Sequence, residues 1–164
     1  MMQTIECPSC AGEFVKRVRR STSFERLLSF FYLYPFRCQL CDHAFKVFQP
    51  GIRYIRVDED RREYQRIDVN FPVWLKKDII KCDGSAVDLS MSGCTVRTDS
   101  VPPLASIVSV GFEVPNEPMP VTIETAIVRN ASANRVGLEF LRFHGDERQR
   151  LRRVLHGLMT QAVV

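Results

Sequence analysis

The sequence predicts a mainly β protein in which a small antiparallel barrel with a C-terminal helix follows a separate cysteine-containing module. Three observations support this fold class. Beyond residue 60, short runs of residues alternate between apolar and polar, the period of half-buried strands. Proline, glycine and asparagine separate these runs, so the connections are short. Two Cys-x-x-Cys pairs lie in the first fifty residues, ahead of the strand pattern.

Six strands are predicted in the second part of the chain. The first begins at Ile67, where every second residue is apolar as far as Leu75. Asp83 and Gly84 then predict a tight hairpin turn. The other strands are predicted at residues 86–89, 94–98, 107–114, 121–128 and 135–140. Short strands with short connections indicate an antiparallel sheet that closes into a barrel.

A C-terminal helix is predicted to begin near Asp146, which is a favourable N-cap residue. Its apolar face, which can close one end of the barrel, comprises Leu151, Val154, Leu155 and Leu158. The opposite face is expected to be solvated and carries Arg148, Arg150, Arg152 and Arg153.

Composition sets broad limits on the function. The 164 residues are 26% charged and 45% hydrophobic, with a formal net charge of +4, which mildly favours anionic partners. No apolar run approaches the roughly eighteen residues that a membrane-spanning helix needs, and the N-terminal residues lack the basic-then-apolar pattern of a signal sequence. We therefore expect a cytoplasmic protein without a membrane span. In that compartment its six cysteines are thiols or metal ligands.

The two cysteine pairs predict a structural zinc site. Cys7, Cys10, Cys38 and Cys41 offer four thiolates to one tetrahedral ion, and each pair is followed by an aromatic residue, which resembles a zinc ribbon. The alternatives are a redox pair or unrelated buried thiols, and His43 is a possible replacement for one sulfur. The pairs are separated by about 27 residues, more than the usual 15 to 20, so an inserted element is required.

That insert predicts a helix over residues 23–34, which begins at a capping box formed by Thr22 and Glu25 and ends before Pro35. We expect its apolar face to pack on the cysteine module or on the second domain. A basic run, Lys16-Arg17-Val18-Arg19-Arg20, precedes the helix. Such a run is either a solvated segment or a contact for nucleic acid.

The predicted domain organisation places the cysteine module at residues 1–50, a linker at 51–60 and the barrel at 61–164. The linker carries an acidic triplet, Asp58-Glu59-Asp60. This triplet either restrains the arginines that follow it or is an ordinary solvated charge run.

A candidate anion-binding motif flanks the first predicted strand. Arg62 and Arg66 carry planar donor forks that match phosphate oxygens or the O6/N7 edge of guanine. Asp88 can accept from guanine N–H groups and Ser90 can donate to a phosphate or a base. Gly93 permits close backbone approach or a positive φ. Together these residues suit a guanine nucleotide.

The order Arg-x-x-x-Arg, then a strand, then Asp-x-Ser-x-x-Gly resembles the PilZ domain, a bacterial signal-transduction module that binds cyclic di-GMP. The resemblance covers the chain from about residue 60 onward and implies a six-stranded barrel with a closing helix. It also implies that the arginines clamp guanine and phosphate while the Asp-x-Ser-x-x-Gly turn wraps the other side. Arg61 directly precedes the motif and would help to neutralise a stacked pair of ligand molecules.

The expected function is therefore a receptor that passes cyclic di-GMP binding to the zinc module or to an unidentified protein partner. The alternative is a nucleic-acid-binding or protein-interaction zinc-ribbon protein with a silent barrel. An enzyme is not expected, because the sequence offers no paired carboxylates, histidine-activated nucleophile or open metal site.

Overall fold

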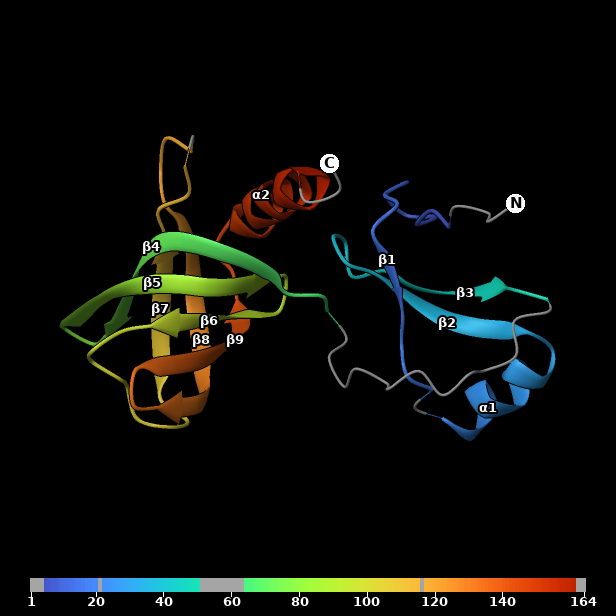
Figure 1. Ribbon diagram of the computed structural model, residues 1–164, viewed down its shortest axis with the longest axis horizontal. Coiled ribbons are helices and arrows are strands. Elements are labelled where there is room, and N and C mark those ends of the chain that lie inside the picture. Colours follow the sequence, from blue (N-terminus) through green and yellow to red (C-terminus); the bar gives the residue numbers. More distant parts are fainter. Residues whose placement is uncertain (1–4, 21, 51–63, 116, 162–164) are drawn as a thin grey trace. The chain divides into compact units, whose positions relative to one another are not determined.

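The chain folds into two compact units, one comprising Met1–Gln65 and the other Arg66–Val164. The computed structural model describes residues 5–20, 22–50, 64–115 and 117–161, and Figure 1 shows that each unit is built on its own antiparallel sheet. The predicted linker, residues 51–60, lies outside the described residues, as do Arg61 and Arg62.

The first unit is a three-stranded antiparallel sheet in the order β1-β2-β3, with one short helix between β1 and β2 in the chain. The elements are β1 (Val15–Arg17), α1 (Ser23–Phe30), β2 (Leu33–Cys38) and β3 (Ala44–Phe48). The central strand β2 buries Tyr34 and Phe36, and the Phe36 ring stacks on Phe45 of β3 with centroids 6.2 Å apart. The core of this small unit therefore combines aromatic side chains with the buried Cys7, Cys38 and Leu40.

The capping box of α1 is confirmed, because the Thr22 side chain accepts from the Glu25 backbone and the Glu25 side chain accepts from the Thr22 backbone. The predicted length was wrong. The helix ends at Phe30, and Tyr32 adopts a left-handed φ of 59°, so the chain turns into β2 four residues before the predicted end. Pairing of β2 with both neighbours outweighs the local helical pattern. Within the described residues α1 contacts β2 and half-buries Leu28, but none of its side chains is fully buried, so its apolar face packs on this unit only in part.

The second unit is a closed six-stranded antiparallel barrel, as the sequence predicts, and its strand order is β4-β5-β6-β9-β8-β7. The strands are β4 (Ile67–Lys77), β5 (Ile80–Ser90), β6 (Gly93–Arg97), β7 (Ile107–Phe112), β8 (Val121–Ser132) and β9 (Arg135–Arg142). Closure pairs β7 with β4, so no sheet edge remains. Alternate residues of each strand fill the interior, where Leu75, Leu89, Val110, Phe112 and Ile123 are almost completely buried.

The first hairpin of the barrel turns at Asp78 and Ile79, and the predicted turn at Asp83 and Gly84 was wrong. Asp78 adopts a left-handed φ of 53°, which aspartate tolerates better than most residues. Gly84 instead lies inside β5, where an added Cβ would come within 2.4 Å of the Arg97 carbonyl oxygen. A glycine at this position therefore allows β5 and β6 to approach closely and does not form a turn.

The C-terminal helix α2 (Glu147–Gln161) contacts β8 and β4 and buries Leu151, Val154, Leu155 and Met159. One of the four arginines expected in solvent is not solvated. Arg150 donates to Glu147 at 2.8 Å and to the Met119 carbonyl at 2.6 Å, which joins α2 to the loop before β8. The Glu147 carboxylate raises the pKa of Arg150 above its ordinary value. No helix among the described residues is both long enough and apolar enough to cross a membrane.

Candidate functional site

Arg66 and Asp88 form the charged centre of the candidate site on the barrel. The Arg66 Nη1 atom donates to Asp88 Oδ1 at 2.8 Å and to Thr95 Oγ1 at 2.8 Å. Asp88 Oδ1 also accepts from the Thr95 backbone N–H at 3.0 Å. Arg66 immediately precedes β4, while Asp88 and Thr95 face each other in the β5–β6 pairing. The barrel thus brings together two of the predicted ligand-binding residues.

Thr95 is a member of this cluster that the sequence did not single out. It sits in a strand of alternating pattern, where a threonine carries no signal of its own. Its position opposite Asp88 depends on the register of β5 with β6, including the irregularity between Ala86 and Asp88. Strand register of this kind is a tertiary property, so no motif could have marked Thr95.

Ser90 and Gly93 close the tight β5–β6 turn and are paired with each other. The Ser90 hydroxyl is buried and donates to the Gly93 carbonyl at 3.0 Å. An added Cβ on Gly93 would lie 2.2 Å from the Leu138 carbonyl oxygen of β9. Close backbone approach, and not a positive φ, is therefore what requires a glycine at this position. Asp88, Ser90 and Gly93 are joined by one hairpin.

The four cysteines of the N-terminal pairs converge on one point of the first unit. The sulfur atoms of Cys7, Cys10, Cys38 and Cys41 all lie within 4.8 Å of one another. Two of these distances, Cys7 to Cys41 and Cys10 to Cys38, are 3.5 Å and 3.6 Å. A tetrahedral ion with bonds of about 2.3 Å to sulfur requires sulfur atoms about 3.8 Å apart. The cluster therefore has the dimensions of a four-coordinate metal site.

The Cys38 sulfur has the surroundings of a metal-bound thiolate. The backbone N–H groups of Leu40 and Cys41 each point at Cys38 Sγ, with distances of 3.5 Å. Burial raises the pKa of the Cys38 thiol to about 12, whereas these two backbone donors act in the opposite direction. A bound cation would supply the remaining charge stabilisation, because metal coordination deprotonates a thiol.

The loop of the second cysteine pair also holds the segment that precedes Arg66. The Gln65 backbone N–H donates to Gln39 Oε1 at 2.6 Å, and the Tyr64 hydroxyl donates to Asp42 Oδ1. Arg37 Nη1 donates to the same Asp42 oxygen at 2.8 Å. The raised pKa of Tyr64, about 12, follows first from burial and then from the neighbouring Asp42 carboxylate. All of these groups belong to the first unit, and sequence reasoning missed their association.

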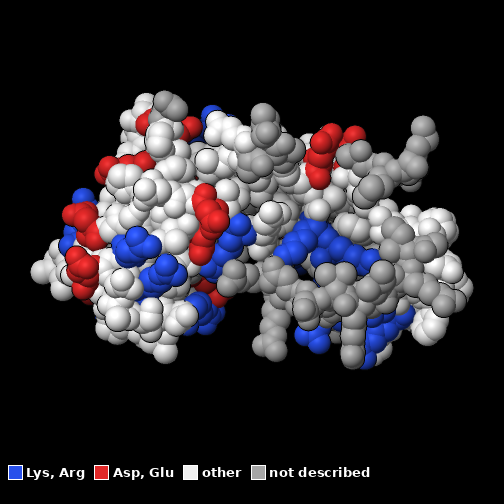
Figure 2. Space-filling model, viewed as in Figure 1, with Lys and Arg blue, Asp and Glu red and all other residues white. Residues whose placement is uncertain are grey.

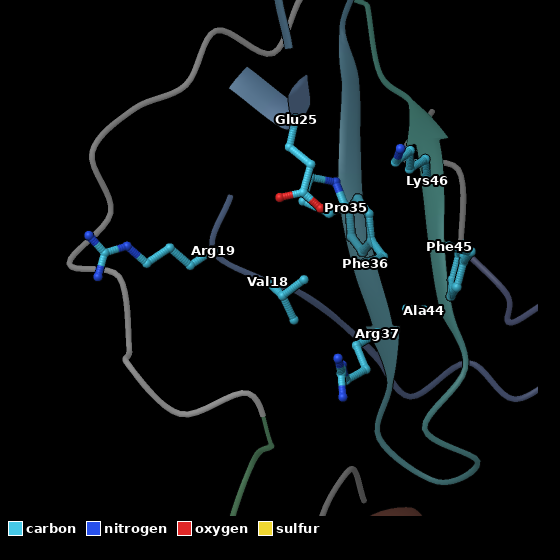
Figure 3. A pocket seen from close by; sticks show the side chains of 9 residues that line it. All are labelled: Val18, Arg19, Glu25, Pro35, Phe36, Arg37, Ala44, Phe45 and Lys46. Atoms are coloured by element: carbon cyan, nitrogen blue, oxygen red, sulfur yellow. The ribbon is translucent and has the colours of Figure 1, made fainter. Parts of the chain in front are cut away.

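A basic pocket of about 360 Å³ opens on the first unit (Figure 3). Arg19 and Lys46 lie on either side of β2 in this view, and the Phe36 ring lies between them. The lining residues are Val18, Arg19, Glu25, Pro35, Phe36, Arg37, Ala44, Phe45 and Lys46. Figure 2 shows Lys and Arg side chains gathered over the same unit. The pocket combines positive charge with apolar surface.

The closed barrel, its C-terminal helix and the charged pair beside the β5–β6 hairpin define the class of this unit as a small β-barrel domain. The PilZ domain model matches residues 60–157, which is more than half of the chain. The chain therefore belongs to the PilZ domain family. The first fifty residues lie outside that match.

Two solved structures resemble the chain in fold. YcgR from Escherichia coli in complex with c-di-GMP has a TM-score of 0.53 at 16% identity, covering 90% of this chain and 74% of that chain. The inhibitor of motility MotI/DgrA from Bacillus subtilis has a TM-score of 0.51 at 16% identity, covering 80% of this chain and 65% of that chain. Among curated proteins, none matches the chain.

Proposed function

We propose that this protein is a cyclic di-GMP receptor that passes ligand binding to its N-terminal module or to a partner protein. Membership of the PilZ family supports cyclic di-GMP as the ligand, and the YcgR structure, which has a similar fold, contains this nucleotide. The observation that carries the proposal is the Arg66–Asp88 pair, whose atoms lie 2.8 Å apart with side chains 28% and 19% exposed. A charged donor and a charged acceptor are therefore presented together at a partly accessible point of the barrel.

The proposed roles follow from the hydrogen-bonding capacity of each group. Within the described residues Arg66 uses only Nη1, so Nη2 and Nε remain for a phosphate or a guanine edge. Asp88 has a second carboxylate oxygen for guanine N–H groups. Ser90 and Gly93 shape the hairpin that carries Asp88. Arg62 and Arg61 would complete the site from the segment before Arg66, and Arg61 would favour a second, stacked ligand molecule.

Isothermal titration of the full-length, zinc-loaded protein with cyclic di-GMP tests this proposal. We expect saturable binding that Arg66→Ala and Arg62→Ala each weaken by about 30-fold or more, the cost of losing one charged partner. Arg153→Ala, an exposed arginine of α2, is the matched control and should bind as the wild type does. GMP serves as the ligand control.

The titration also measures the number of bound molecules. Two molecules per chain would support the role of Arg61, whereas one molecule would argue against stacking. A folded wild-type protein that gives no heat and no competition with cyclic di-GMP would overturn the receptor proposal. A receptor of this kind binds its ligand without chemical change, so the recovered nucleotide should be intact.

We also infer that Cys7, Cys10, Cys38 and Cys41 hold one structural zinc ion. The donor set, the sulfur spacing and the N–H groups directed at Cys38 support this assignment. Four sulfur ligands leave no open position for water, so the ion would supply folding energy rather than catalysis. Metal analysis of protein purified without added metal should give about one zinc per chain, and serine in place of Cys10 should lower that value.

The second candidate function is nucleic-acid binding by the first unit. The pocket beside β2 favours it, because Arg19 and Lys46 can contact phosphates while Phe45 offers a face for a base. We expect any such binding to weaken steeply with salt and to be lost in the charge-reversed variant Arg19→Glu/Lys46→Glu. Equal binding by this variant and the wild type would exclude the pocket as the contact.

A further inference from the structure

Two of the three residues between the motif arginines are bound to the loop of the second cysteine pair. The Gln65 backbone N–H donates to Gln39 Oε1 at 2.6 Å, and the Tyr64 hydroxyl donates to Asp42 Oδ1. Gln39 lies between the two cysteines of this pair, and Asp42 directly follows the second one. We call these two hydrogen bonds the Tyr64–Gln65 anchor.

The acceptors of the anchor are fixed by the fold of the cysteine loop. Gln39 is 3% exposed, its backbone N–H donates to the Phe14 carbonyl at 2.8 Å, and its Nε2 donates to the Arg37 carbonyl at 3.2 Å. Asp42 adopts a left-handed φ of 67° and is held by Arg37 at 2.8 Å. The positions of both acceptors therefore depend on the loop conformation that a bound metal would stabilise.

We propose that the Tyr64–Gln65 anchor couples the cysteine cluster to the nucleotide site, so that metal and cyclic di-GMP bind cooperatively. Tyr64 and Gln65 are positioning residues, because they act on the arginines beside them rather than on the ligand. This inference rests on the proposed receptor function and names the regulation of the same site. On this proposal the N-terminal module regulates ligand binding, a role that the residues of the barrel do not supply.

The coupling between metal binding and cyclic di-GMP binding should be positive, because both depend on the order of the same segment. Gln65 is the last residue of the first unit and Arg66 is the first residue of the second. Because Gln65 and Arg66 are consecutive, the hydrogen bond of the Gln65 N–H to Gln39 restricts the backbone beside Arg66, whose side chain contacts Asp88. A segment that is already ordered loses less conformational entropy when the ligand binds. Loss of the anchor should therefore weaken ligand binding.

Coupling of this kind is reciprocal. If the metal-stabilised loop raises the affinity for cyclic di-GMP, the nucleotide must raise the affinity for the metal by the same factor. A purely structural role for the metal would not give this result, since the nucleotide would then leave metal binding unchanged.

The first test compares nucleotide affinity among variants of the full-length, metal-loaded protein. Tyr64→Phe removes only the hydroxyl and should weaken cyclic di-GMP binding about tenfold, as expected for one hydrogen bond to a charged acceptor. Tyr32→Phe is the control, because Tyr32 is an exposed tyrosine of the same unit whose hydroxyl makes no hydrogen bond within the described residues. Asp42→Asn keeps an acceptor and tolerates the left-handed φ, so it should retain more affinity than Asp42→Ala.

The second test needs no nucleotide. The Gln65 amide should be protected from hydrogen exchange in metal-loaded protein and lose that protection in Gln39→Ala, in Asp42→Ala and after chelation. In the third test, cyclic di-GMP should slow the transfer of metal to a chromogenic chelator about tenfold in the wild type. Tyr64→Phe should reduce this effect.

The outcomes separate the two proposals. If the wild type binds cyclic di-GMP but Tyr64→Phe and chelation leave the affinity unchanged, the anchor proposal falls and the receptor function stands. If the folded wild type does not bind cyclic di-GMP, both fall. An unprotected Gln65 amide in metal-loaded protein would overturn the anchor by itself, whatever the nucleotide does.

Discussion

Arg66 Nη1 lies 2.8 Å from Asp88 Oδ1, although the two residues are 22 positions apart in the sequence. The whole of β4, its hairpin turn and most of β5 lie between them, so the contact exists only because the β4–β5 hairpin returns the chain to its starting point. Asp88 is further held by the Thr95 backbone at 3.0 Å. A ligand that engages this carboxylate meets a group whose direction is already set.

Thr95→Val should weaken cyclic di-GMP binding about three- to tenfold while leaving the barrel folded. Valine has nearly the same shape and favours strands, but it removes the hydroxyl that accepts from Arg66 Nη1 at 2.8 Å. Isothermal titration measures the affinity and circular dichroism checks the fold. Thr125→Val, in strand β8, is the matched control. Unchanged affinity in Thr95→Val would mean that Thr95 does not position Arg66 for the ligand.

Gly93→Ala should destabilise the barrel by about 1 to 3 kcal/mol, the usual cost of overpacking. The new Cβ would lie 2.2 Å from the Leu138 carbonyl, which is backbone and cannot rotate away. Gly157→Ala is the matched control, because nothing lies within 4 Å of its added Cβ and alanine favours the helix. That variant should be as stable as the wild type or slightly more so. Denaturant unfolding measures both, and equal stability of the two variants would contradict the predicted clash.

Metal removal should unfold the first unit and leave the barrel intact. The first unit has a small core and two cysteine pairs that converge on one point, whereas the barrel is closed by its own strand pairing. NMR spectra recorded before and after chelation should lose the dispersed signals of β1–β3 and keep those of β4–β9. Restoration of the lost signals by added zinc controls for damage by the chelator. Unchanged signals from the first unit after complete metal loss would contradict this prediction.

Cys94 should resist alkylation in the native protein at pH 8.5, whereas Cys82 should react. Burial raises the pKa of the Cys94 thiol well above its ordinary value, so the reactive thiolate is scarce and the sulfur is inaccessible. Cys82 is partly exposed and serves as the internal comparison. Mass spectrometry after a timed reaction with iodoacetamide measures both sites. Unfolding in denaturant should abolish the difference, and rapid modification of Cys94 in the native protein would contradict its burial.

Much of the fold could be predicted because it depends on local pattern. The alternation from Ile67 to Leu75 appears as β4, and the capping box of Thr22 and Glu25 begins α1. The position of the first hairpin turn could not be predicted, since Asp83 and Gly84 have good turn propensity yet pair within β5. Propensity is a weak preference that strand pairing overrides.

The sequence by itself determined which chemical groups are available: two cysteine pairs, an arginine pair and an Asp-x-Ser-x-x-Gly turn, each recognisable because its members are close in the chain. Tertiary structure decided which of them meet. In the folded chain Arg66 contacts Asp88 and Thr95, and the four cysteine sulfur atoms lie close together. Tyr64 and Gln65 are hydrogen-bonded to the cysteine loop. These associations depend on strand register and loop closure, which combine residues far apart in sequence and leave no local pattern to read.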